Sequence, residues 1–397
     1  MREAPIIESL LDTDFYKFTM ARFIRETYGA IPVRYALRCR TRDARLAELV
    51  DPEALSEQLD HVLSLRFHRD ELDYLAANPT CPLAGGFIEE GLASLKLADV
   101  EIGQDRDGLR LEIAGSWSDA ILWETYVLSI VNELYARGLA RERDMNPDKL
   151  WDEGDRRLNA KIARLKGTGV KIVEFGTRRR FCRDWQEHVL NVMTARLPAE
   201  IVGTSNVLLA RRYGLKPVGT MAHELFMVRA AIAEDDAELR ASQGAMLDHW
   251  QEAYGDALSI ALSDTFGADA FFRDFAGERA KAWRGVRHDS GDPFDFGERV
   301  IRFYEDQRVD PQTKTIVFSD GLDVEAILKL HERFDRRIGV MFGWGTDLTN
   351  DVGLPTLSLV MKVVSAFDCP TVKLSDDAGK HTGPPDEIAR YLRVFSS

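Results

Sequence analysis

The apolar and polar positions follow one pattern in the first third of the chain and another in the rest. Residues 33–40 alternate between apolar and polar side chains, as a half-buried strand does. Residues 100–113 predict a hairpin around the Asp-Gly pair at 107–108, which favours a tight turn. Residues 119–136 predict a helix capped by Asp119, because apolar residues recur there at near-helical spacing. We therefore expect mixed α and β structure in this third.

From about residue 171, short apolar runs each end in a loop rich in glycine or acidic residues, and most then lead into a helical segment. Repeated strand–loop–helix units indicate a parallel sheet. Polar loops after successive strands are typical of the carboxyl end of an α/β barrel. The runs are VKIVEFGTRRR, EIVGTSN, PVGTMAHE, LSIALSDTF, WRGVRHDSGDP, TIVFSDGLD and GVMFGWGTDLTND.

An open doubly wound sheet is the structural alternative. No GxGxxG sequence follows the first of these strands, and polar motifs follow nearly all of them instead of gathering at one switch point. The pattern therefore favours an α/β barrel. Its predicted helices include 206–213, which ends at Gly214, 294–307, with Pro293 in the first turn, and 324–334.

The bulk properties exclude several classes of protein. The 397 residues suggest about two domains, and a net charge of −13 argues against a broad nucleic-acid or membrane surface. Local cations and backbone N–H groups can still hold a small anionic ligand. No apolar run reaches about 18 residues, and the start does not resemble a signal peptide. We expect a cytoplasmic protein without a zinc site, whose free thiols are Cys39, Cys81, Cys182 and Cys369.

Two late loops offer groups that suit a sugar phosphate. Asp320 follows an apolar run in FSDGLD, where a carboxylate suits ribose hydroxyls or a metal held by pyrophosphate, while Asp323 reads as the cap of the next helix. Gly343 and Gly345 in FGWGTD let the backbone approach an anion, and Thr346 adds a hydroxyl. The alternative for this loop is an ordinary glycine turn.

Two further loops carry charged or nucleophilic side chains. In RHDSGDP, Arg287 suits a carboxylate ligand and Asp289 suits ribose hydroxyls, whereas the Asp-Pro pair at 292–293 reads as a helix start. In GTMAHE, His223 follows an apolar run. It is a candidate general base, metal ligand or nucleophile, and a structural histidine is the alternative.

Arg178 and Tyr16 are candidate ligand-binding residues, and each also has a purely structural interpretation. Arg178 begins a run of three arginines after a buried-looking strand, so a phosphate contact competes with a solvated basic face. Tyr16 could stack on an aromatic ligand, although such a tyrosine more often belongs to a core or an interface.

Together, eight stretches resemble the bacterial nicotinate phosphoribosyltransferase family. They run from residue 13 to residue 380 in the family's order, so the resemblance covers nearly the whole chain. Each stretch is short, but eight in order are highly specific. They are TDFYKFTM, EFGTRRRF, GTSNVLLA, GTMAHE, RHDSGDP, FSDGLD, FGWGTDLTND, and LVMKVV followed by VKLSDDAGK.

The resemblance implies an irregular α/β barrel of the type II phosphoribosyltransferases beside an N-terminal α+β domain. On this basis we expect an N-terminal domain at 1–136 and a barrel at 137–365. A C-terminal segment at 366–397 would return to pack on the N-terminal domain, which would place VKLSDDAGK outside the barrel. The resemblance also implies a homodimer with active sites at the subunit interface.

The implied reaction joins nicotinate to phosphoribosyl pyrophosphate, with ATP as co-substrate and Mg²⁺ bound mainly through pyrophosphate. His223 would be the histidine that ATP phosphorylates. Arg287 would face the nicotinate carboxylate. Asp289 and Asp320 would serve the ribose and the magnesium pyrophosphate. Tyr16, reaching from the partner subunit, and Phe175 would sandwich the pyridine ring. Arg178 would contact phosphate. Gly345 and Thr346, beside Gly343, would bind the 5′-phosphate.

Ser205 in GTSN bears on the choice of base. Nicotinamide-using relatives carry an aspartate there, which would repel a carboxylate, so serine favours nicotinate. A nicotinamide phosphoribosyltransferase and a non-catalytic phosphosugar-binding protein of the same fold remain alternatives, although His223, Asp289 and Asp320 are present. Many relatives carry a smaller aliphatic residue where this chain has Trp344. Because both glycines are kept, we expect this difference to affect the packing of the loop more than its function.

Overall fold

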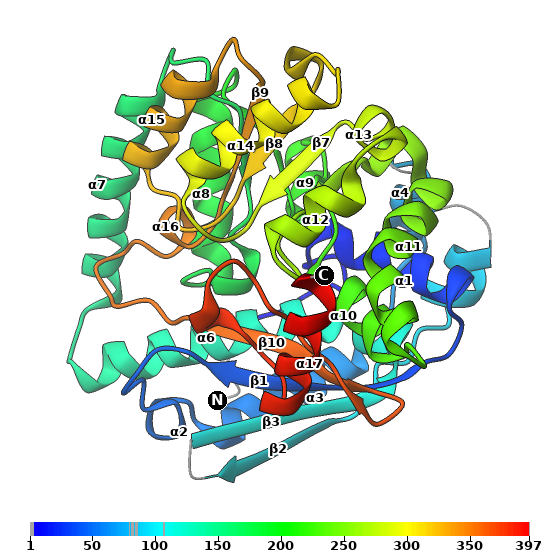
Figure 1. Ribbon diagram of the computed structural model, residues 1–397. Helices are drawn as coiled ribbons and strands as arrows, with labels where there is room; N and C mark the ends of the chain where they lie inside the picture. Colours follow the sequence, from blue (N-terminus) through cyan, green and yellow to red (C-terminus); the bar gives the residue numbers. More distant parts are fainter. Residues whose placement is uncertain (1–3, 79, 81–82, 84–85, 106–107, 397) are drawn as a thin grey trace.

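The computed structural model describes residues 4–78, 80, 83, 86–105 and 108–396. Two sheets organise these residues, an antiparallel sheet of five strands and a parallel sheet of six. Figure 1 shows the antiparallel sheet at the bottom of the molecule and the parallel strands with their helices above it. The α/β class expected from the sequence is confirmed.

The antiparallel sheet joins the two ends of the chain. Its strands are β1 (Pro32–Cys39), β2 (Val100–Asp105), β3 (Gly108–Ser116), β10 (Leu359–Ala366) and β11 (Cys369–Pro370). They lie in the order β11-β10-β1-β3-β2, and Figure 1 shows β1 and β10 side by side. The predicted strand at 33–40 and the two strands of the predicted hairpin are confirmed. Asp107 of the hairpin turn lies outside the described residues.

The predicted helix at 119–136 is wrong at its start. Asp119 lies inside a separate short helix and its Oδ1 accepts a hydrogen bond from Ser118, so it caps neither helix. The long helix begins at Trp123, because the bend before it turns the fully buried Ile121 and Leu122 into the core. The helical segments of this third are α1 (Phe15–Thr27), α2 (Leu46–Leu49), α3 (Pro52–Ser64), α4 (Arg69–Ala76), the π-helix η1 (Phe87–Leu92), α5 (Trp117–Ala120) and α6 (Trp123–Glu142).

The parallel sheet is an irregular, incompletely paired barrel. Its strands are β4 (Ile172–Glu174), β5 (Ile201–Thr204), β6 (Ile260–Leu262), β7 (Gly285–His288), β8 (Thr315–Phe318) and β9 (Gly339–Trp344). They lie in the order β5-β4-β9-β8-β7-β6, so β5 and β6 form its two ends. The run PVGTMAHE, which we expected to contain a strand, adds only one parallel bridge, from Pro217 to Thr204.

Helices connect the parallel strands, and the three predicted ones are confirmed to within a residue at each end. Gly214 ends its helix with φ 64°, while Asp292 and Asp323 cap the next two through their side chains. The segments are α7 (Pro147–Leu165), η2 (Thr177–Arg179), α8 (Arg183–Arg196), α9 (Val207–Tyr213), α10 (His223–Ala231), α11 (Asp236–Tyr254), η3 (Gly255–Leu258), α12 (Ala268–Phe275), α13 (Glu278–Ala282), α14 (Pro293–Asp306), η4 (Pro311–Thr313), α15 (Val324–Phe334) and α16 (Thr346–Thr349).

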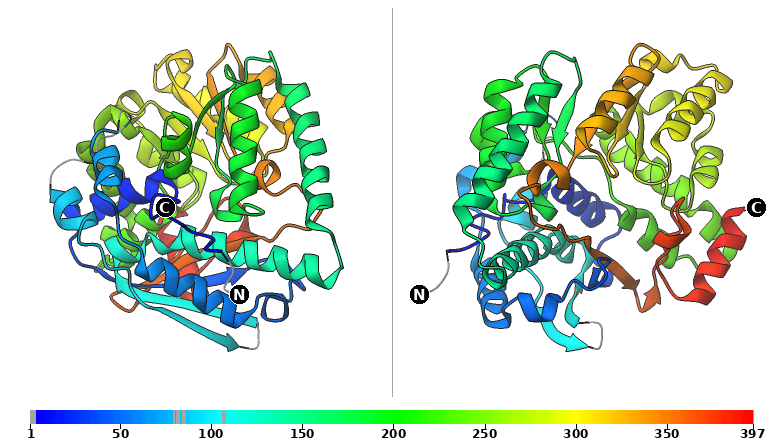
Figure 2. Two further views of the ribbon diagram at one scale, coloured as in Figure 1. Left: turned by 180° about the vertical axis from the view of Figure 1, so that it is seen from behind. Right: turned by 90° about the vertical axis from the view of Figure 1, so that its left-hand side faces the viewer.

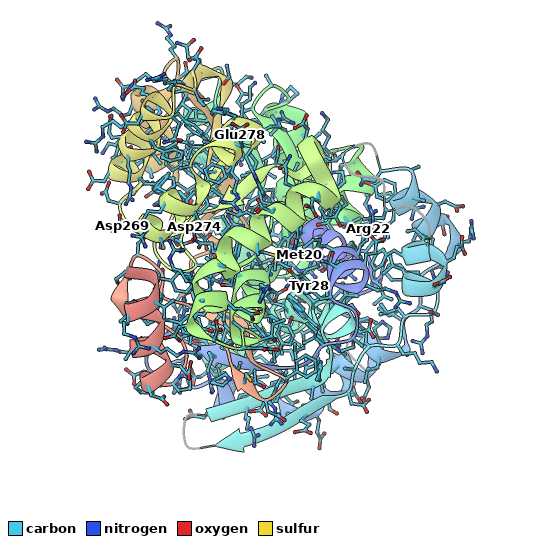
Figure 3. All side chains as sticks on the ribbon, turned by 45° about the vertical axis from the view of Figure 1, so that its right-hand side comes forward. Met20, Arg22, Tyr28, Asp269, Asp274 and Glu278 are labelled. Carbon is cyan, nitrogen blue, oxygen red and sulfur yellow. The ribbon has the colours of Figure 1, made fainter. Side chains whose placement is uncertain are left out.

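Helix α1 is fixed against α11, as Figure 3 shows around the labelled Tyr28. The Tyr28 hydroxyl lies 3.0 Å from Nδ1 of His249, and the ring of Phe23 meets Trp250 edge-on at 5.1 Å. These contacts matter for function because the first turn of α1 carries candidate site residues toward the parallel strands.

The C-terminal segment differs in part from the expectation. β11 pairs with β10 in the antiparallel sheet, but α17 (Pro385–Ser396), which follows η5 (Ala378–Lys380), contacts α11 and α12 instead of the N-terminal domain. Its apolar side is covered there, since the Phe395 ring stacks on Phe266 at 4.2 Å. Arg390 pairs with Asp236 on the surface. Figure 2 shows α17 in red beside these helices. The proposed domain boundaries stay a prediction.

A helix that spans a bilayer needs about 20 predominantly apolar residues. Within the described ranges, no helix is long and apolar enough to span a membrane.

Candidate active site

A cavity of about 730 Å³ lies between the carboxyl ends of the parallel strands and strand β10. The loops after β4, β7, β8 and β9 line one side, and β10 with the segment after it lines the other. A small adjoining pocket opens between α1 and β5. The structure brings every predicted site residue to one of these two spaces: Tyr16, Phe175, Arg178, His223, Arg287, Asp289, Asp320, Gly343, Gly345 and Thr346 line the cavity, and Ser205 lines the pocket.

His223 is the first residue of α10 and sits at the centre of a polar cluster. Its Nδ1 lies 3.0 Å from the Thr265 hydroxyl, and its Nε2 lies 3.0 Å from Asp289 Oδ2 and 2.9 Å from Lys373 Nζ. Burial and the positive charge of Lys373 lower the pKa of His223 to about 4. The imidazole is therefore neutral at physiological pH.

The two contacts of Nε2 require opposite protonation states. An ammonium group can only donate, so Lys373 requires a lone pair on Nε2, whereas the Asp289 carboxylate requires a proton there. The Thr265 hydroxyl is compatible with either tautomer, because it can donate to Nδ1 or accept from it. A neutral His223 can thus present an unprotonated Nε2 when Lys373 holds it.

Arg287 and Asp289 form a rigid pair at the end of β7. Nη2 of Arg287 donates to Asp289 Oδ1 at 2.7 Å, and its Nε donates to the Ser319 hydroxyl at 2.8 Å. Burial alone would raise the pKa of Asp289, but Arg287 and His223 outweigh it and hold the pKa well below its usual range. Asp289 therefore stays a carboxylate.

The adjoining pocket is lined by two aromatic rings and two arginines. Arg287 lies 5.9 Å from the ring centre of Phe175, and Arg178 lies 5.7 Å from that of Tyr16. A flat, anionic aromatic ligand fits such a setting. The hydroxyl of the buried Tyr16 has no hydrogen-bond partner among the described residues.

The position of Tyr16 corrects one expectation. The resemblance implies that Tyr16 reaches the site of a partner subunit, but its side chain lines the cavity of its own chain. The reason is local: Gly219 has no side chain, and a Cβ there would lie 2.8 Å from the backbone nitrogen of Tyr16. The first turn of α1 can therefore pack directly on the loop before α10.

Ser205 does not offer its proton to a ligand. Its hydroxyl donates to Asp14 Oδ1 at 2.6 Å, and Arg178 pairs with Oδ2 of the same carboxylate at 3.2 Å. Sequence reasoning missed Asp14. Burial raises its pKa despite the charge of Arg178, and the pairing with Arg178 reduces its repulsion of an anionic ring substituent.

The glycine loop after β9 serves packing as well as access. A Cβ on Gly343 would lie 2.4 Å from the Phe175 ring, so this glycine makes room for the ring, while Gly345 and Thr346 line the cavity. Trp344 is not among the residues that line the cavity. It is fully buried and its Nε1 donates to Asp347. The departure at Trp344 therefore leaves the lining of the cavity unchanged.

Asp320 is a candidate for metal contact, whereas a second group is not. Asp320 also pairs with an ammonium, that of Lys380 at 2.9 Å, but its side chain remains 40% exposed and is therefore accessible to a metal that arrives with a ligand. Oxygen and nitrogen atoms of His223, Asp264 and Asp289 also lie within 4.8 Å of one another. Lys373 enters that second group, 3.2 Å from Asp264, so an ammonium already supplies its positive charge.

Several cavity residues carry charges that sequence reasoning did not assign. Lys373 and Lys380 lie in VKLSDDAGK, which we expected outside the barrel, yet they reach His223 and Asp320 across the cavity. Burial, with Lys373 and Arg40 nearby, lowers the pKa of Lys362 to about 7. One signal in the sequence pointed to these lysines: LVMKVV, which contains Lys362, and VKLSDDAGK are both among the family motifs. The unassigned cationic residues are Arg40, Arg179, Lys362, Lys373 and Lys380.

The fold and the cavity together define a class: an α/β protein with a pocket lined by aromatic rings beside a cavity lined by cations and carboxylates, at the carboxyl ends of parallel strands. The sequence profile of the nicotinate phosphoribosyltransferase (NAPRTase) family matches residues 170–396, and that of its N-terminal domain matches residues 11–132. The chain belongs to the nicotinate phosphoribosyltransferase family.

Individual relatives agree with this assignment over the full chain. The nicotinate phosphoribosyltransferase of Chromobacterium violaceum is 42% identical over 404 residues, which cover 99% of this chain and 97% of that protein. That of Ralstonia pickettii is also 42% identical, over 98% of each. The crystal structure of the Vibrio cholerae nicotinate phosphoribosyltransferase superimposes with a TM-score of 0.90 at 36% identity, covering 99% of this chain and 94% of the other.

Proposed function

We propose that this protein is an ATP-coupled nicotinate phosphoribosyltransferase. It joins nicotinate to phosphoribosyl pyrophosphate, releases pyrophosphate and forms nicotinate mononucleotide, while ATP is hydrolysed to ADP and phosphate. The observation that carries the proposal is that two spaces share one wall, since Tyr16, Phe175, Arg178 and Arg287 line both. One is a ring pocket flanked by arginines and the other a cavity lined by lysines and carboxylates. Family membership supports the same reaction.

Each substrate part has a matching group. The pyridine ring lies between Tyr16 and Phe175, with its carboxylate toward Arg287, whose guanidinium offers the opposite charge. Asp289 accepts from the ribose hydroxyls. The 5′-phosphate meets Gly345 and Thr346 after β9. Because positive charge develops on the ribose as pyrophosphate leaves, positioning and charge stabilisation by these groups supply most of the catalysis.

Pyrophosphate departs toward the lysines of the opposite wall. Lys362 and Lys380 line that wall, and Asp320 faces the cavity beside Lys380. A carboxylate oxygen is a ligand that Mg²⁺ prefers, so Asp320 fits the metal that pyrophosphate carries in. That metal would neutralise charge on the leaving group. The His223 group does not fit a resident ion, because Lys373 lies within it.

ATP enters the cycle through His223. A neutral imidazole is a competent nucleophile toward the γ-phosphate, and the lowered pKa of His223 keeps it neutral. The phosphoryl group adds about two negative charges at neutral pH. Lys373, 2.9 Å from Nε2, is placed to pair with it. The phosphorylated enzyme would then favour a tight-binding state, and hydrolysis would release product.

A homodimer is part of the proposal, as the family resemblance implies. Since Tyr16 lines the cavity of its own chain, each subunit would hold a complete ring pocket. The dimer would then stabilise the fold without completing the active site.

A turnover assay tests the proposal and its alternatives together. Nicotinate, nicotinamide and quinolinate are offered in parallel with phosphoribosyl pyrophosphate, with and without ATP, and pyrophosphate release is measured. We expect release with nicotinate and stimulation of that release by ATP. Equal turnover of nicotinamide would overturn the assignment of the ring pocket. No release with any base would favour a non-catalytic phosphosugar-binding protein.

A further inference from the structure

A buried ionic network begins at Glu224, the residue after His223, and runs along the wall of the same cavity, which Glu224 and Glu124 both line. Glu224 points out of the first turn of α10, where its Oε1 lies 3.2 Å from Lys17 Nζ and its Oε2 accepts a hydrogen bond from the Tyr35 hydroxyl at 3.2 Å. Lys17 is completely buried and also pairs with Glu124 at 2.5 Å. One ammonium from α1 therefore joins the helix of His223 to α6.

The same network ends in the ring pocket. The other oxygen of Glu124, Oε1, lies 3.2 Å from Arg178 Nη1. Arg178 in turn pairs with Asp14 and lies over the Tyr16 ring. Lys17 directly follows Tyr16 in α1. A continuous series of ion pairs thus connects the neighbour of His223 with one wall of the ring pocket.

The charges make this network sensitive to a new anion. Two carboxylates, Glu124 and Glu224, share the single ammonium of Lys17. Burial raises the pKa of Glu224 despite Lys17, whereas Lys17 and Arg178 outweigh burial and lower the pKa of Glu124 to about 2. Glu224 follows His223 in the chain and lines the same cavity, so a charge added at His223 acts on it through an interior that screens charges weakly. Any shift of Glu224 then changes how Lys17 holds Glu124, and through it Arg178.

We propose that Lys17 is a positioning residue that transmits the phosphorylation of His223 to the ring pocket through Glu224, Glu124 and Arg178. The proposal rests on the proposed phosphohistidine. It would let phosphorylation at His223 change the binding of nicotinate although His223 does not line the ring pocket. Lys17 itself touches neither substrate, since it lines neither space.

The test compares the nicotinate KM with and without ATP in wild type, Lys17→Met and Glu224→Gln, and measures phosphohistidine with γ-labelled ATP in each. We expect both variants to carry the label. The ratio of the nicotinate KM without ATP to the KM with ATP should be at least fivefold smaller in each variant than in wild type. Lys314→Met is the matched control: Lys314 is also a buried lysine, held by the carbonyls of Lys281 and Trp283 near the start of β8. It should keep the wild-type ratio.

The outcomes separate this inference from the proposed function. A labelled Glu224→Gln protein with the wild-type KM ratio would overturn the role of the network, and it would do so even if Lys17→Met failed to fold. An unlabelled wild-type protein would instead overturn the phosphohistidine and the coupling with it. If Lys314→Met also lost the difference between the KM values with and without ATP, the effect would come from general destabilisation, which would contradict the proposal.

Discussion

The surroundings of His223 show what single residues add beyond their motif. The sequence left open a general base, a metal ligand, a nucleophile or a structural histidine at this position. Thr265, Asp289 and Lys373 approach its two ring nitrogens within 3.0 Å, and burial keeps the ring neutral. Only the folded chain brings Lys373 there, from 150 residues away along the sequence. The spacing of residues along the sequence therefore could not predict this contact.

Arg287 carries the first prediction at this scale. Its replacement by alanine removes the guanidinium from the ring pocket and leaves Asp289 without its 2.7 Å partner. We expect the nicotinate KM to rise by roughly tenfold or more, about 1.4 kcal/mol of binding. Steady-state kinetics with varied nicotinate measure it. Arg299→Ala, which removes a surface arginine paired with Asp269, serves as the control. An unchanged KM would remove Arg287 from the ring pocket.

At the scale of elements, the helices and strands with clear end signals were predictable and the bent or bridged ones were not. Asp292, Asp323 and Gly214 mark helix ends through backbone chemistry that is local to the sequence. The bend before Trp123 and the single bridge at Pro217 depend on tertiary packing. The path of α17 likewise depends on the apolar surface of Phe266, which no local pattern reveals.

Strand β4 gives a prediction about pH. Its last residue, Glu174, is fully buried and accepts hydrogen bonds from Thr204, Gln186 and the backbone of Gly176, and burial raises its pKa to about 7. The folded state therefore binds a proton between about pH 4.5 and 7 that the unfolded state has lost, so stability falls as pH rises through 7. We expect wild type to lose about 1 kcal/mol between pH 6 and 8 from this group.

Glu174→Gln tests that assignment by urea unfolding at the two pH values. The amide cannot ionise, so this part of the loss should disappear, although the variant itself loses an acceptor and is expected to be less stable at pH 6. The same pH dependence in variant and wild type would mean that Glu174 is ionised throughout.

At the scale of the whole molecule, the C-terminal part of the chain completes the site by returning to the antiparallel sheet. β10 pairs with β1, and the segment after it brings Lys373 and Lys380 over the ends of the parallel strands. The sequence indicated two domains but not that the cavity lies between their sheets. Covering the site in this way excludes water and strengthens the charge interactions inside it.

A mixing experiment follows from the position of Tyr16. Because Tyr16 and Asp289 line the same cavity of one chain, a Tyr16→Ala subunit and an Asp289→Ala subunit each lack part of their own site. We expect no recovery of activity above the sum of the two variants after subunit exchange, which native mass spectrometry verifies. Recovery toward a quarter or more of wild-type activity would show that Tyr16 serves the partner subunit.

The central claim is that His223 is phosphorylated by ATP while the transfer site is built from other loops. Incubation with γ-labelled ATP should give an acid-labile, base-stable label in wild type and none in His223→Ala. The variant should lose the ATPase coupled to transfer but retain slow, ATP-independent transfer, since the ribose, pyrophosphate and pyridine contacts come from other residues. An undiminished label in His223→Ala, or wild-type transfer that is insensitive to ATP, would contradict the account.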